Sequence, residues 1–533
     1  MRVKAGLNAR PFSWPASTNG PRILGLLLGV LLLAACASLP PAPAHAPEPA
    51  FASPETTALG ALSSEAARAH PSRSGLLFQD TGRQALVQRA LLIEAATRSI
   101  DAQYYIWNSD QSGRYLACRL YAAAERGVRV RLMLDDMNVA GRDALLAALD
   151  DHANIEIRIY NPNAVRGGPR KWLSLATEFE RMNRRMHNKS FVADAAFGIV
   201  GGRNIGDEYF DLHPEVNFRD RDVLAIGPVV AQIAANFDTF WNSTLAYPIR
   251  AIAPRAASAP GSTLLATERC ASADEAAALL GSAPRDPAGA LEQLAGILPD
   301  LSWAGAELVF DLPARLQAGE SEQPGRTALV LQALADSATR EVLVESAYLL
   351  LAEAQLETVR AMVERGVRVA AVTNSLATND LVANHSGYAR RRLEKLSSGL
   401  ELHELKPDAA ACALWIEGRD DCGTTAMVSL HSKSAVFDRR TVAVGSFNFN
   451  LRSMYLNSET VLVIHSEELA DQLAEAIELA MAPANSWQVR RAEDGSITWV
   501  AEGGETWTRE PATGFWQRFK SSLLRLVPMD KYL

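Results

Sequence analysis

The sequence predicts an α/β protein built from two tandem units, each with a β-sheet covered by helices on both faces. The first observation is a repeated motif, a His, a Lys two positions later and an Asp seven positions after the His, at residues 187–194 and again at 431–438. The second is an upstream repeat, because Glu-Arg-Gly-Val-Arg-Val occurs at 125–130 and at 364–369. The third is the alternation of short β-type segments with helical ones, which is typical of covered sheets.

The repeated motif carries groups suited to phosphate chemistry. Its residues are His187, Lys189 and Asp194 in the first copy and His431, Lys433 and Asp438 in the second. Side chains two positions apart on a strand share a face, so each copy should present an imidazole beside a positive charge. Two units related by a pseudo-twofold axis can bring both pairs into one cleft. The sequence therefore predicts one composite site per chain, with Asn204 and Asn448 following the two copies.

Periodicity and β-propensity place the elements in a similar order in both units. In the first unit we expect helices at 113–126 and 142–150 and strands at 99–107, 128–134, 155–160, 190–192 and 198–200. In the second unit we expect helices at 354–365 and 388–396 and strands at 341–345, 367–373, 434–437 and 460–464.

The N-terminal residues 1–35 have the features of a secretory signal peptide. Basic residues precede an apolar run at 23–33, which is about half of the ~20 residues that a transmembrane helix needs. The run leads into Leu-Ala-Ala-Cys, which resembles a bacterial lipobox, so we expect Cys36 to be the acylated first residue of the mature protein. An uncleaved anchor with an incidental Cys is the alternative. We expect the protein in the bacterial cell envelope, facing the periplasm, and Ala37 favours the outer membrane.

Composition divides the rest of the chain. The expected parts are a tether at 36–72, a first unit at 73–254, a connector at 255–325, a second unit at 326–485 and an extension at 486–533. The tether is rich in Ala, Pro and Ser and is expected to remain unfolded. The extension ends in a segment, 514–527, that sets aromatic and Leu residues against Arg and Lys at helical spacing. This helix can lie in a membrane interface or dock on the protein's own core.

Four cysteines follow the leader, at Cys118, Cys270, Cys412 and Cys422. They lack CxxC spacing, so a zinc site is not expected. In an oxidising compartment Cys412 and Cys422 are expected to close a disulfide loop beside the second motif, with two free thiols as the alternative. We expect neither a metal nor a cofactor.

The charge of the chain bears on its substrates. A net charge of -8 argues against a general nucleic-acid binder, which would usually be basic. Basic residues nevertheless crowd the approach to the first motif, at Arg166, Arg170, Lys171, Arg181, Arg184 and Arg185. They could hold an anionic headgroup or form a solvated helix face.

The paired motif, with the Gly-rich turn and Asn that follow each copy, resembles the phospholipase D superfamily. Within it, residues 184–191, 201–210 and 224–228 are similar to the bacterial type C cardiolipin synthases. The likeness spans about residues 75 to 533 and includes 103–107 and 385–389. It implies two α/β/α sandwiches packed so that the duplicated motifs meet.

The resemblance also implies an activity. We expect a phosphatidyltransferase that makes cardiolipin by transphosphatidylation between phospholipids, through a phosphohistidine intermediate, at a membrane surface and without nucleic acid. Hydrolysis of phospholipids to phosphatidic acid is an alternative, as is a phosphodiesterase or nuclease of the same superfamily.

Roles can be given to the motif residues. The resemblance favours His187 as nucleophile and His431 as general acid and base, and the near-symmetry of the site leaves the reverse open. Lys189 and Lys433 should supply positive charge, with Asn204 and Asn448 as further donors.

Each His also needs a carboxylate to orient it. The family pattern places these carboxylates at Asp220 and Glu459, with Asp222 as a rival to Asp220. Asp194 and Asp438 are expected to hold the motif loops across the domain interface. A role for His385 stays open.

Overall fold

The computed structural model describes residues 39, 41, 46–139, 141–166, 178–253, 273–281, 285–313, 323–418, 426–527 and 530–532. The signal peptide, Cys36, Ala37, Cys270 and Cys422 lie outside the described residues, as do Arg170 and Lys171. No helix in these described ranges has the length and apolar character needed to cross a membrane.

In the described part of the chain, 18 strands form one continuous sheet, and β7 (Val216–Arg219) and β14 (Met427–Leu430) pair with each other outside it. Its first half runs in the order β9 (Ala246–Pro248), β4 (Ile155–Tyr160), β3 (Arg129–Asp135), β2 (Ser99–Tyr104), β5 (Ser190–Ala193), β6 (Phe197–Gly201), β8 (Asp222–Ile226) and β1 (Ser74–Gln79). Its second half runs in the order β10 (Ser302–Phe310), β17 (Thr460–His465), β16 (Thr441–Gly445), β15 (Lys433–Phe437), β11 (Glu341–Ser346), β12 (Arg368–Asn374), β13 (Glu401–Leu405), β18 (Ser486–Arg491), β19 (Ile497–Val500) and β20 (Thr506–Trp507).

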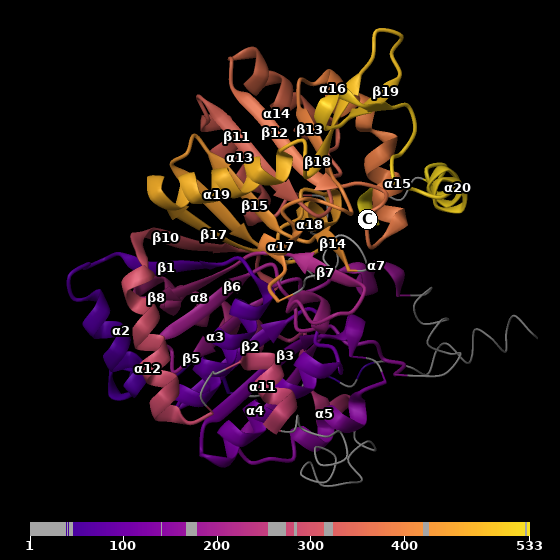
Figure 1. The fold of residues 1–533 in the computed structure, drawn as a ribbon. Coiled ribbons are helices and arrows are strands. Elements are labelled where there is room, and N and C mark those ends of the chain that lie inside the picture. The colour runs from indigo at the N-terminus through magenta and orange to yellow at the C-terminus, as the bar shows by residue number, and fades with distance from the viewer. Residues whose placement is uncertain are drawn as a thin grey trace, which may run out of the picture.

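The two halves meet where β1 pairs antiparallel with β10, with Gly75 opposite Trp303. The strands on the two sides of this junction are arranged alike. β2, β3 and β4 are parallel neighbours in one half, as are β11, β12 and β13 in the other. The predicted duplication with a pseudo-twofold relation is confirmed, and the junction lies at its centre (Figure 1).

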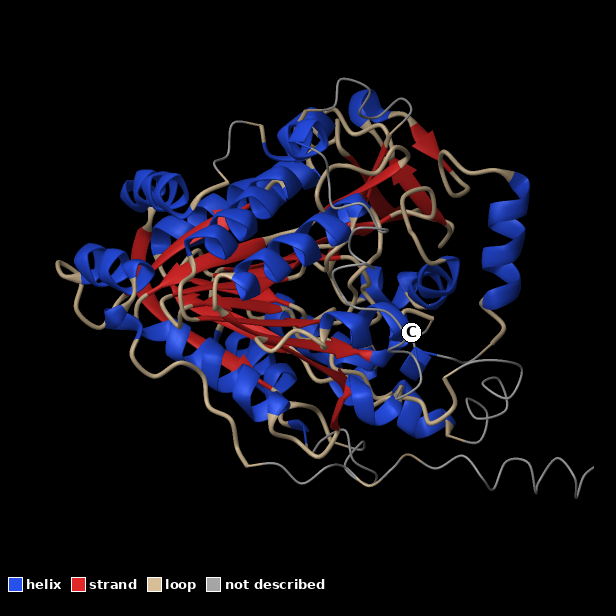
Figure 2. Ribbon diagram, turned by 90° about the horizontal axis from the view of Figure 1, so that it is seen from below, coloured by secondary structure: helices blue, strands red, loops and turns tan. Residues whose placement is uncertain are grey.

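Helices cover both faces of the sheet (Figure 2). One face of the first half packs against α3 (Gly82–Ala95), α4 (Gln111–Glu125) and α5 (Asp143–Leu149), and α12 (Pro287–Ile297) packs on α3. The corresponding face of the second half packs against α13 (Arg326–Ser337) and α14 (Glu353–Glu364). The other face is covered in both halves by α8 (Pro228–Trp241) and α19 (Glu467–Met481), and the buried apolar residues of α19 share one core with those of the first half of α8. The predicted α/β/α arrangement is confirmed.

The sequence of α8 explains how it reaches that core. Pro228 occupies the first turn, where its missing N–H costs nothing, and it follows Gly227 at a φ of 84°. Val230, Ile233 and Phe237 recur at helical spacing and are buried against the sheet. The helix therefore lies along the sheet with its apolar side inward.

Several elements differ from their expected extent. The expected strand at 99–107 ends at Tyr104, because the chain turns there toward the motif of the same unit. The expected helix at 388–396 is two helices, α15 (Val382–Arg390) and α16 (Arg392–Ser397), because Arg391 has the non-helical angles φ −106° and ψ 17°. Arg392 then points inward to buried carboxylates, 2.9 Å from Glu404 Oε1.

Part of the expected tether folds, which corrects the expectation that residues 36–72 stay unfolded. Residues 58–67 form α2 (Ala58–Ala67), and Leu59 is completely buried in the core of the first half. Glu48 accepts hydrogen bonds from Arg158 Nη2 at 2.9 Å and Trp241 Nε1 at 3.1 Å. Likewise, the expected connector contains β10, which joins both halves of the sheet because it pairs with β1 on one side and with β17 on the other.

Cys118 and Cys412 are both disulfide-bonded, so the alternative of free thiols is wrong for Cys412. Cys422, its expected partner, lies outside the described residues.

Candidate active site

Antiparallel pairing brings both motifs to the same edge of the sheet. β5 runs antiparallel to β2, with Ser190 opposite Gln103, and β15 runs antiparallel to β11, with Lys433 opposite Ser346. Each motif His lies two or three residues before its strand, so both lie beside the carboxyl ends of β2 to β4 and β11 to β13. This is the edge at which α/β proteins usually place their sites.

Short parallel pairings cross between the two units at this edge. β7 (Val216–Arg219) pairs with β14 (Met427–Leu430), and the backbone N–H of His431 then donates to the carbonyl of Arg219 at 2.8 Å. A matching bridge joins Met186 to Ser458, after which the N–H of His187 donates to the carbonyl of Ser458 at 3.0 Å. Each His is thereby held next to a carboxylate-bearing segment of the other unit.

The histidine–carboxylate pairs cross in the same way. His187 Nδ1 lies 2.8 Å from Glu459 Oε2, and His431 Nδ1 lies 2.5 Å from Asp220 Oδ2. A carboxylate only accepts, so Nδ1 carries the proton in both rings and Nε2 keeps its lone pair for the substrate. Neither unit can orient its own His, and the site is complete only when both are present.

Glu459 is fixed from several sides. Ser446 Oγ donates to its Oε2 at 2.5 Å, and Ser453 Oγ and Asn457 Nδ2 donate to its Oε1 at 2.7 and 3.2 Å. These hydrogen bonds satisfy the buried carboxylate and fix its direction toward His187.

Asp220 is held differently. Its Oδ1 accepts from the backbone N–H of Arg221 at 2.8 Å. The flanking arginines turn to other carboxylates: Arg219 and Arg221 both pair with Glu345, and Arg221 Nε also lies 2.6 Å from Asp80 Oδ1. Asp220 thus stays available to His431.

Asp222, the rival to Asp220, serves another purpose. Its Oδ2 accepts from Arg89 Nη2 at 2.7 Å, and its Oδ1 accepts from the backbone N–H of Arg203 at 3.1 Å. It therefore braces the sheet below the site.

The two lysines lie under their histidines. Lys189 Nζ donates to the carbonyl of His187 at 2.7 Å, and Lys433 Nζ likewise donates to the carbonyl of His431. Asn204 Nδ2 donates to Tyr209 Oη at 3.0 Å, which uses one of its two N–H groups. Asn448 is buried, and its Oδ1 has no hydrogen-bond partner in the described part of the chain.

Burial keeps both imidazoles neutral in the free site. It lowers the pKa of His187 to about 4 against the opposing charge of Glu459, and burial together with Lys433 lowers the pKa of His431 to about 4. Burial also lowers the pKa of Lys189 to about 7 and depresses the pKa of Lys433. Burial opposes ionisation of Glu459, but His187 and Lys189 hold the pKa of this carboxyl below its usual range. An arriving phosphodiester anion would favour the charged lysines and a protonated imidazole.

Asp194 and Asp438 hold loops within their own units, which corrects the expectation that they act across the interface. Asp194 accepts from the backbone N–H groups of Thr97, Arg98 and Ser99, just where β2 begins. Asp438 does the same at residues 339–341, before and at the start of β11. Both lie in left-handed turns, with φ of 50° and 55°, which Asp tolerates better than most residues.

Aromatic rings that the motif did not reveal complete the walls. Tyr105 meets the ring of His187 edge-on at a centroid distance of 5.0 Å. Tyr209 meets that of His431 edge-on at 5.1 Å, and Phe218 stacks on it at 5.0 Å. Tyr105 and Tyr209 lie inside two of the segments that carry the resemblance, so a signal was present, whereas Phe218 gave none.

The sequences of both units match known proteins. They match the family model described as cardiolipin synthase, PLD-like domain, at residues 90–241 and 331–480. Cardiolipin synthase C of Escherichia coli K12 is 39% identical over 471 residues, which are 86% of this chain and 96% of that protein. The chain belongs to the phospholipase D-like cardiolipin synthase family. It is a phospholipase D-type enzyme.

More distant relatives agree. Cardiolipin synthase A of Pseudomonas entomophila is 25% identical over 389 residues, covering 72% of this chain and 64% of that one. The crystal structure of phosphatidylserine synthase from Haemophilus influenzae Rd KW20 has a TM-score of 0.54 at 14% identity and covers 88% of this chain and 100% of that one. The fold is shared at a level where sequence identity is low.

The basic residues before the first motif of this family member are mostly paired. Arg166 bonds with Asp136 and Asp143, Arg181 pairs with Glu178, and Arg185 lies 3.3 Å from Asp135. These three arginines are thus engaged by carboxylates of their own unit.

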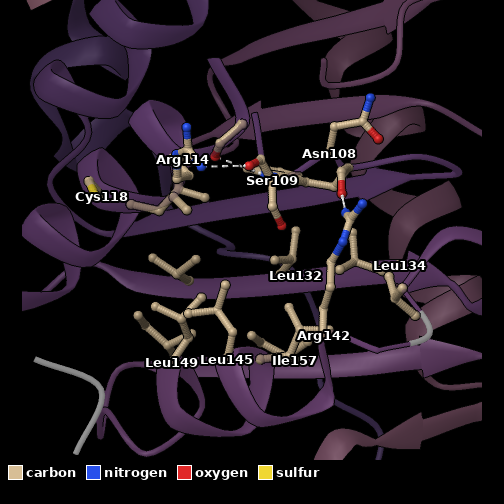
Figure 3. Close-up of a pocket in the computed structure, with 18 residues that line it drawn as sticks. Asn108, Ser109, Arg114, Cys118, Leu132, Leu134, Arg142, Leu145, Leu149 and Ile157 are labelled. Atoms are coloured by element: carbon tan, nitrogen blue, oxygen red, sulfur yellow. Dashed lines mark hydrogen bonds between the residues drawn. The ribbon is translucent and has the colours of Figure 1, made fainter. Parts of the chain in front are cut away.

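Apolar cavities lie away from the catalytic edge. In the first unit of the enzyme, a cavity of about 60 Å³ opens between β3, β4, α4 and α5, with Leu132, Leu149 and Ile157 pointing into it (Figure 3). The second unit has a cavity of about 100 Å³ under α13 and α14. No motif residue lines either cavity. Among the described residues, no three His, Cys, Asp or Glu side chains converge as a metal site.

Proposed function

We propose that the enzyme makes cardiolipin by moving a phosphatidyl group from one phospholipid to the headgroup alcohol of another. The observation that carries this is the crossed pair of oriented imidazoles with Nε2 left for substrate. Family membership supports phospholipids as the substrates.

In the first step, His187 Nε2 attacks phosphorus and the bond from phosphorus to the leaving alcohol breaks. His431 donates its proton to the departing oxygen, while Lys189 and Lys433 stabilise the charge on the nonbridging oxygens. In the second step, the acceptor hydroxyl attacks phosphorus, His431 takes its proton, and the N–P bond breaks to restore His187. Water as the acceptor would instead give phosphatidic acid.

Trapping tests the roles of the two histidines. His431→Ala should slow breakdown of the intermediate when the donor carries a leaving group that needs no protonation. Peptide mass spectrometry after a mildly basic quench should find the phosphatidyl adduct on the peptide that carries His187. An adduct on His431 in the parent enzyme would reverse the roles, and no adduct during turnover would favour direct displacement.

The enzyme is proposed to be anchored by a lipid on Cys36 in the outer membrane and to face the periplasm. The disulfides at Cys118 and Cys412 support a location outside the reducing cytoplasm. Labelling of cells with an alkyne fatty acid tests the anchor: the parent should be labelled and Cys36→Ser should not.

Lipid analysis tests the activity itself. The chain, expressed in cells that lack their own cardiolipin synthases, should restore cardiolipin, and His187→Ala and His431→Ala should not. Accumulation of phosphatidic acid without cardiolipin would show hydrolysis instead. Cleavage of nucleic acid without any change in lipids would overturn the proposal.

A further inference from the structure

The C-terminal helix α20 (Phe515–Leu524) docks on the protein by one side only. It packs against α15, with Ser521 buried and its hydroxyl 3.3 Å from that of Ser386. Gln517 Nε2 donates to the carbonyl of Leu376 at 2.7 Å. In Figure 1 the helix lies at the margin of the molecule, beyond α15. The helix can therefore dock on the protein's own core with one side and lie in a membrane interface with the other, so the two alternatives for this segment are compatible.

The outward side of α20 is strongly apolar. Phe515 and Trp516 expose 66% and 69% of their surfaces, and Phe519 and Leu523 expose half or slightly more. The three rings contact one another, with the Phe515 and Trp516 centroids 5.4 Å apart. Leu526, just after the helix, exposes 78%. A contiguous patch of this kind marks an interaction surface rather than scattered surface residues.

A basic cavity adjoins this helix. It measures about 450 Å³, and among its lining residues are Arg392, Arg509, Arg518, Arg525, Glu510 and Trp499. Glu510 is engaged by Arg392 at 2.9 Å and Arg525 at 3.1 Å, which leaves positive charge in excess. Arg525 Nε is buried and has no hydrogen-bond partner in the part of the chain that is described. Forked guanidinium groups with spare donors suit a phosphate.

Both α20 and the residues after it contact segments close to the catalytic edge. Leu376, which receives Gln517, lies two residues after Asn374, whose side chain binds the backbone of Leu430 next to His431. At the far end, Arg452 Nη1 donates to the carbonyl of Tyr532 at 3.0 Å. α18 (Leu451–Tyr455), which contains Arg452, also carries the Ser453 that holds Glu459. A surface that binds α20 would thus lie beside the entrance to the site.

We propose that α20 and the arginine cavity dock this enzyme on a bilayer of anionic phospholipid. The aromatic side of α20 enters the interface, and the cavity receives the phosphate of a lipid that is not being cleaved. Apolar residues on one side with Arg518, Lys520 and Arg525 nearby fit an interfacial helix attracted to anionic lipid. The role of docking in turnover rests on the proposed function, whereas the docking itself does not.

Vesicle flotation tests the docking. The chain from residue 37 onward lacks both the apolar run at 23–33 and Cys36 but keeps every described residue, and it should float with vesicles of phosphatidylcholine and phosphatidylglycerol. Adding Phe515→Ser, Trp516→Ser and Phe519→Ser should weaken binding about tenfold or more, because interfacial binding scales with buried apolar area. Leu329→Ser, at an exposed Leu on α13, is the matched control and should bind like its parent.

A second variant tests the role of the arginine cavity. Arg509→Gln with Arg518→Gln should remove the preference for vesicles with phosphatidylglycerol over phosphatidylcholine alone. An unchanged preference would overturn the cavity's role. Inorganic phosphate at a concentration that abolishes the preference without changing ionic strength would instead indicate a free-phosphate site.

Turnover separates docking from catalysis. With a short-chain phospholipid below its micelle concentration, the triple variant should match its parent, while on vesicles its apparent KM should rise and kcat should hold. Equal loss on both substrates, or binding equal to the parent, would overturn the proposal. A parent dimer that the triple variant converts to monomer would assign the apolar side to a second copy of the chain. If the parent binds vesicles but never turns over phospholipid, the proposed function fails and the docking stands.

Discussion

The crossed carboxylates show what a single residue contributes to this site. His187 depends on Glu459 and His431 depends on Asp220, each from the opposite unit. The repeated motif identified both histidines, whereas the family resemblance pointed to Glu459 and to Asp220, with Asp222 as its rival. The sequence could not reveal which acid meets which imidazole, since that depends on the parallel pairings of β7 with β14 and Met186 with Ser458.

The crossing leads to opposite effects for the two acids in a burst assay. With a p-nitrophenyl phosphodiester, whose leaving group needs no proton, Asp220→Asn should keep a fast first burst and slow later turnovers. Glu459→Gln should slow the burst itself, by about 10²- to 10⁴-fold, because the nucleophile loses its tautomer support. Stopped-flow absorbance measures both. The reverse pattern would mean that each acid serves the His of its own unit, or that the histidines exchange roles.

The neutral imidazoles also predict how stability depends on pH. The pKa of His187 and of His431 is about 4 in the fold and about 6.5 in the unfolded chain. As pH falls below about 6.5, these histidines become protonated in the unfolded chain but not in the folded protein. The free energy of unfolding therefore decreases down to about pH 4. Each His accounts for about 3 kcal/mol at most.

Replacing both histidines with Gln should flatten this loss, measured by urea unfolding at each pH. His403 is a matched control, because burial lowers its pKa to about 4 as well, away from the site. His403→Gln should flatten the curve by a comparable amount per residue and keep activity. If the double variant lost as much stability between about pH 6.5 and pH 4 as its parent, the two imidazoles would be charged in the folded protein.

At the scale of helices and strands, the periodicity of the sequence predicted the regular elements. It did not predict the features that depend on tertiary contacts. The strands around both motifs are where alternation predicts them, and β4 spans the predicted residues. The break between α15 and α16 was hidden, because Arg392 reads as a surface residue until Glu404 and Glu510 are known to lie beneath it. α2 was missed because the composition around it is that of a linker, although Leu59 is buried.

The loops that follow the two motif strands lead to a prediction for the Asp of each motif. Asp194→Asn should lower the free energy of unfolding by about 2–4 kcal/mol, because a buried charged acceptor of several backbone N–H groups is lost. Asp438→Asn should cost less, because Asp438 is only half-buried. Thermal unfolding measures both, and kcat per folded molecule should change little. A large fall in kcat with normal stability would instead give Asp194 a part in the chemistry.

The whole molecule is organised around the junction of β1 with β10. The two-unit architecture could be predicted from the repeated motif and its upstream repeat. The junction itself could not, because β10 lies in a segment whose Ala, Gly and Pro content indicated a connector. Since β10 also pairs with β17, and β1 with β8, this junction fixes one unit against the other and so sets the distance between the two motifs.

A site completed within one chain predicts that two inactive chains cannot help each other. His187→Ala and His431→Ala chains, mixed after separate purification or produced together, should show no more activity than the two measured alone. Each chain lacks one imidazole, and the intact one is held by a carboxylate of its own chain across the β7–β14 or Met186–Ser458 pairing. Co-production of residues 1–281 with 282–533 is the positive control, because β1 with β10 and α3 with α12 offer surfaces through which the halves can rejoin. Recovery of activity in the mixture of full-length variants would mean that units exchange between chains, and the active form would then be a swapped dimer rather than the single chain.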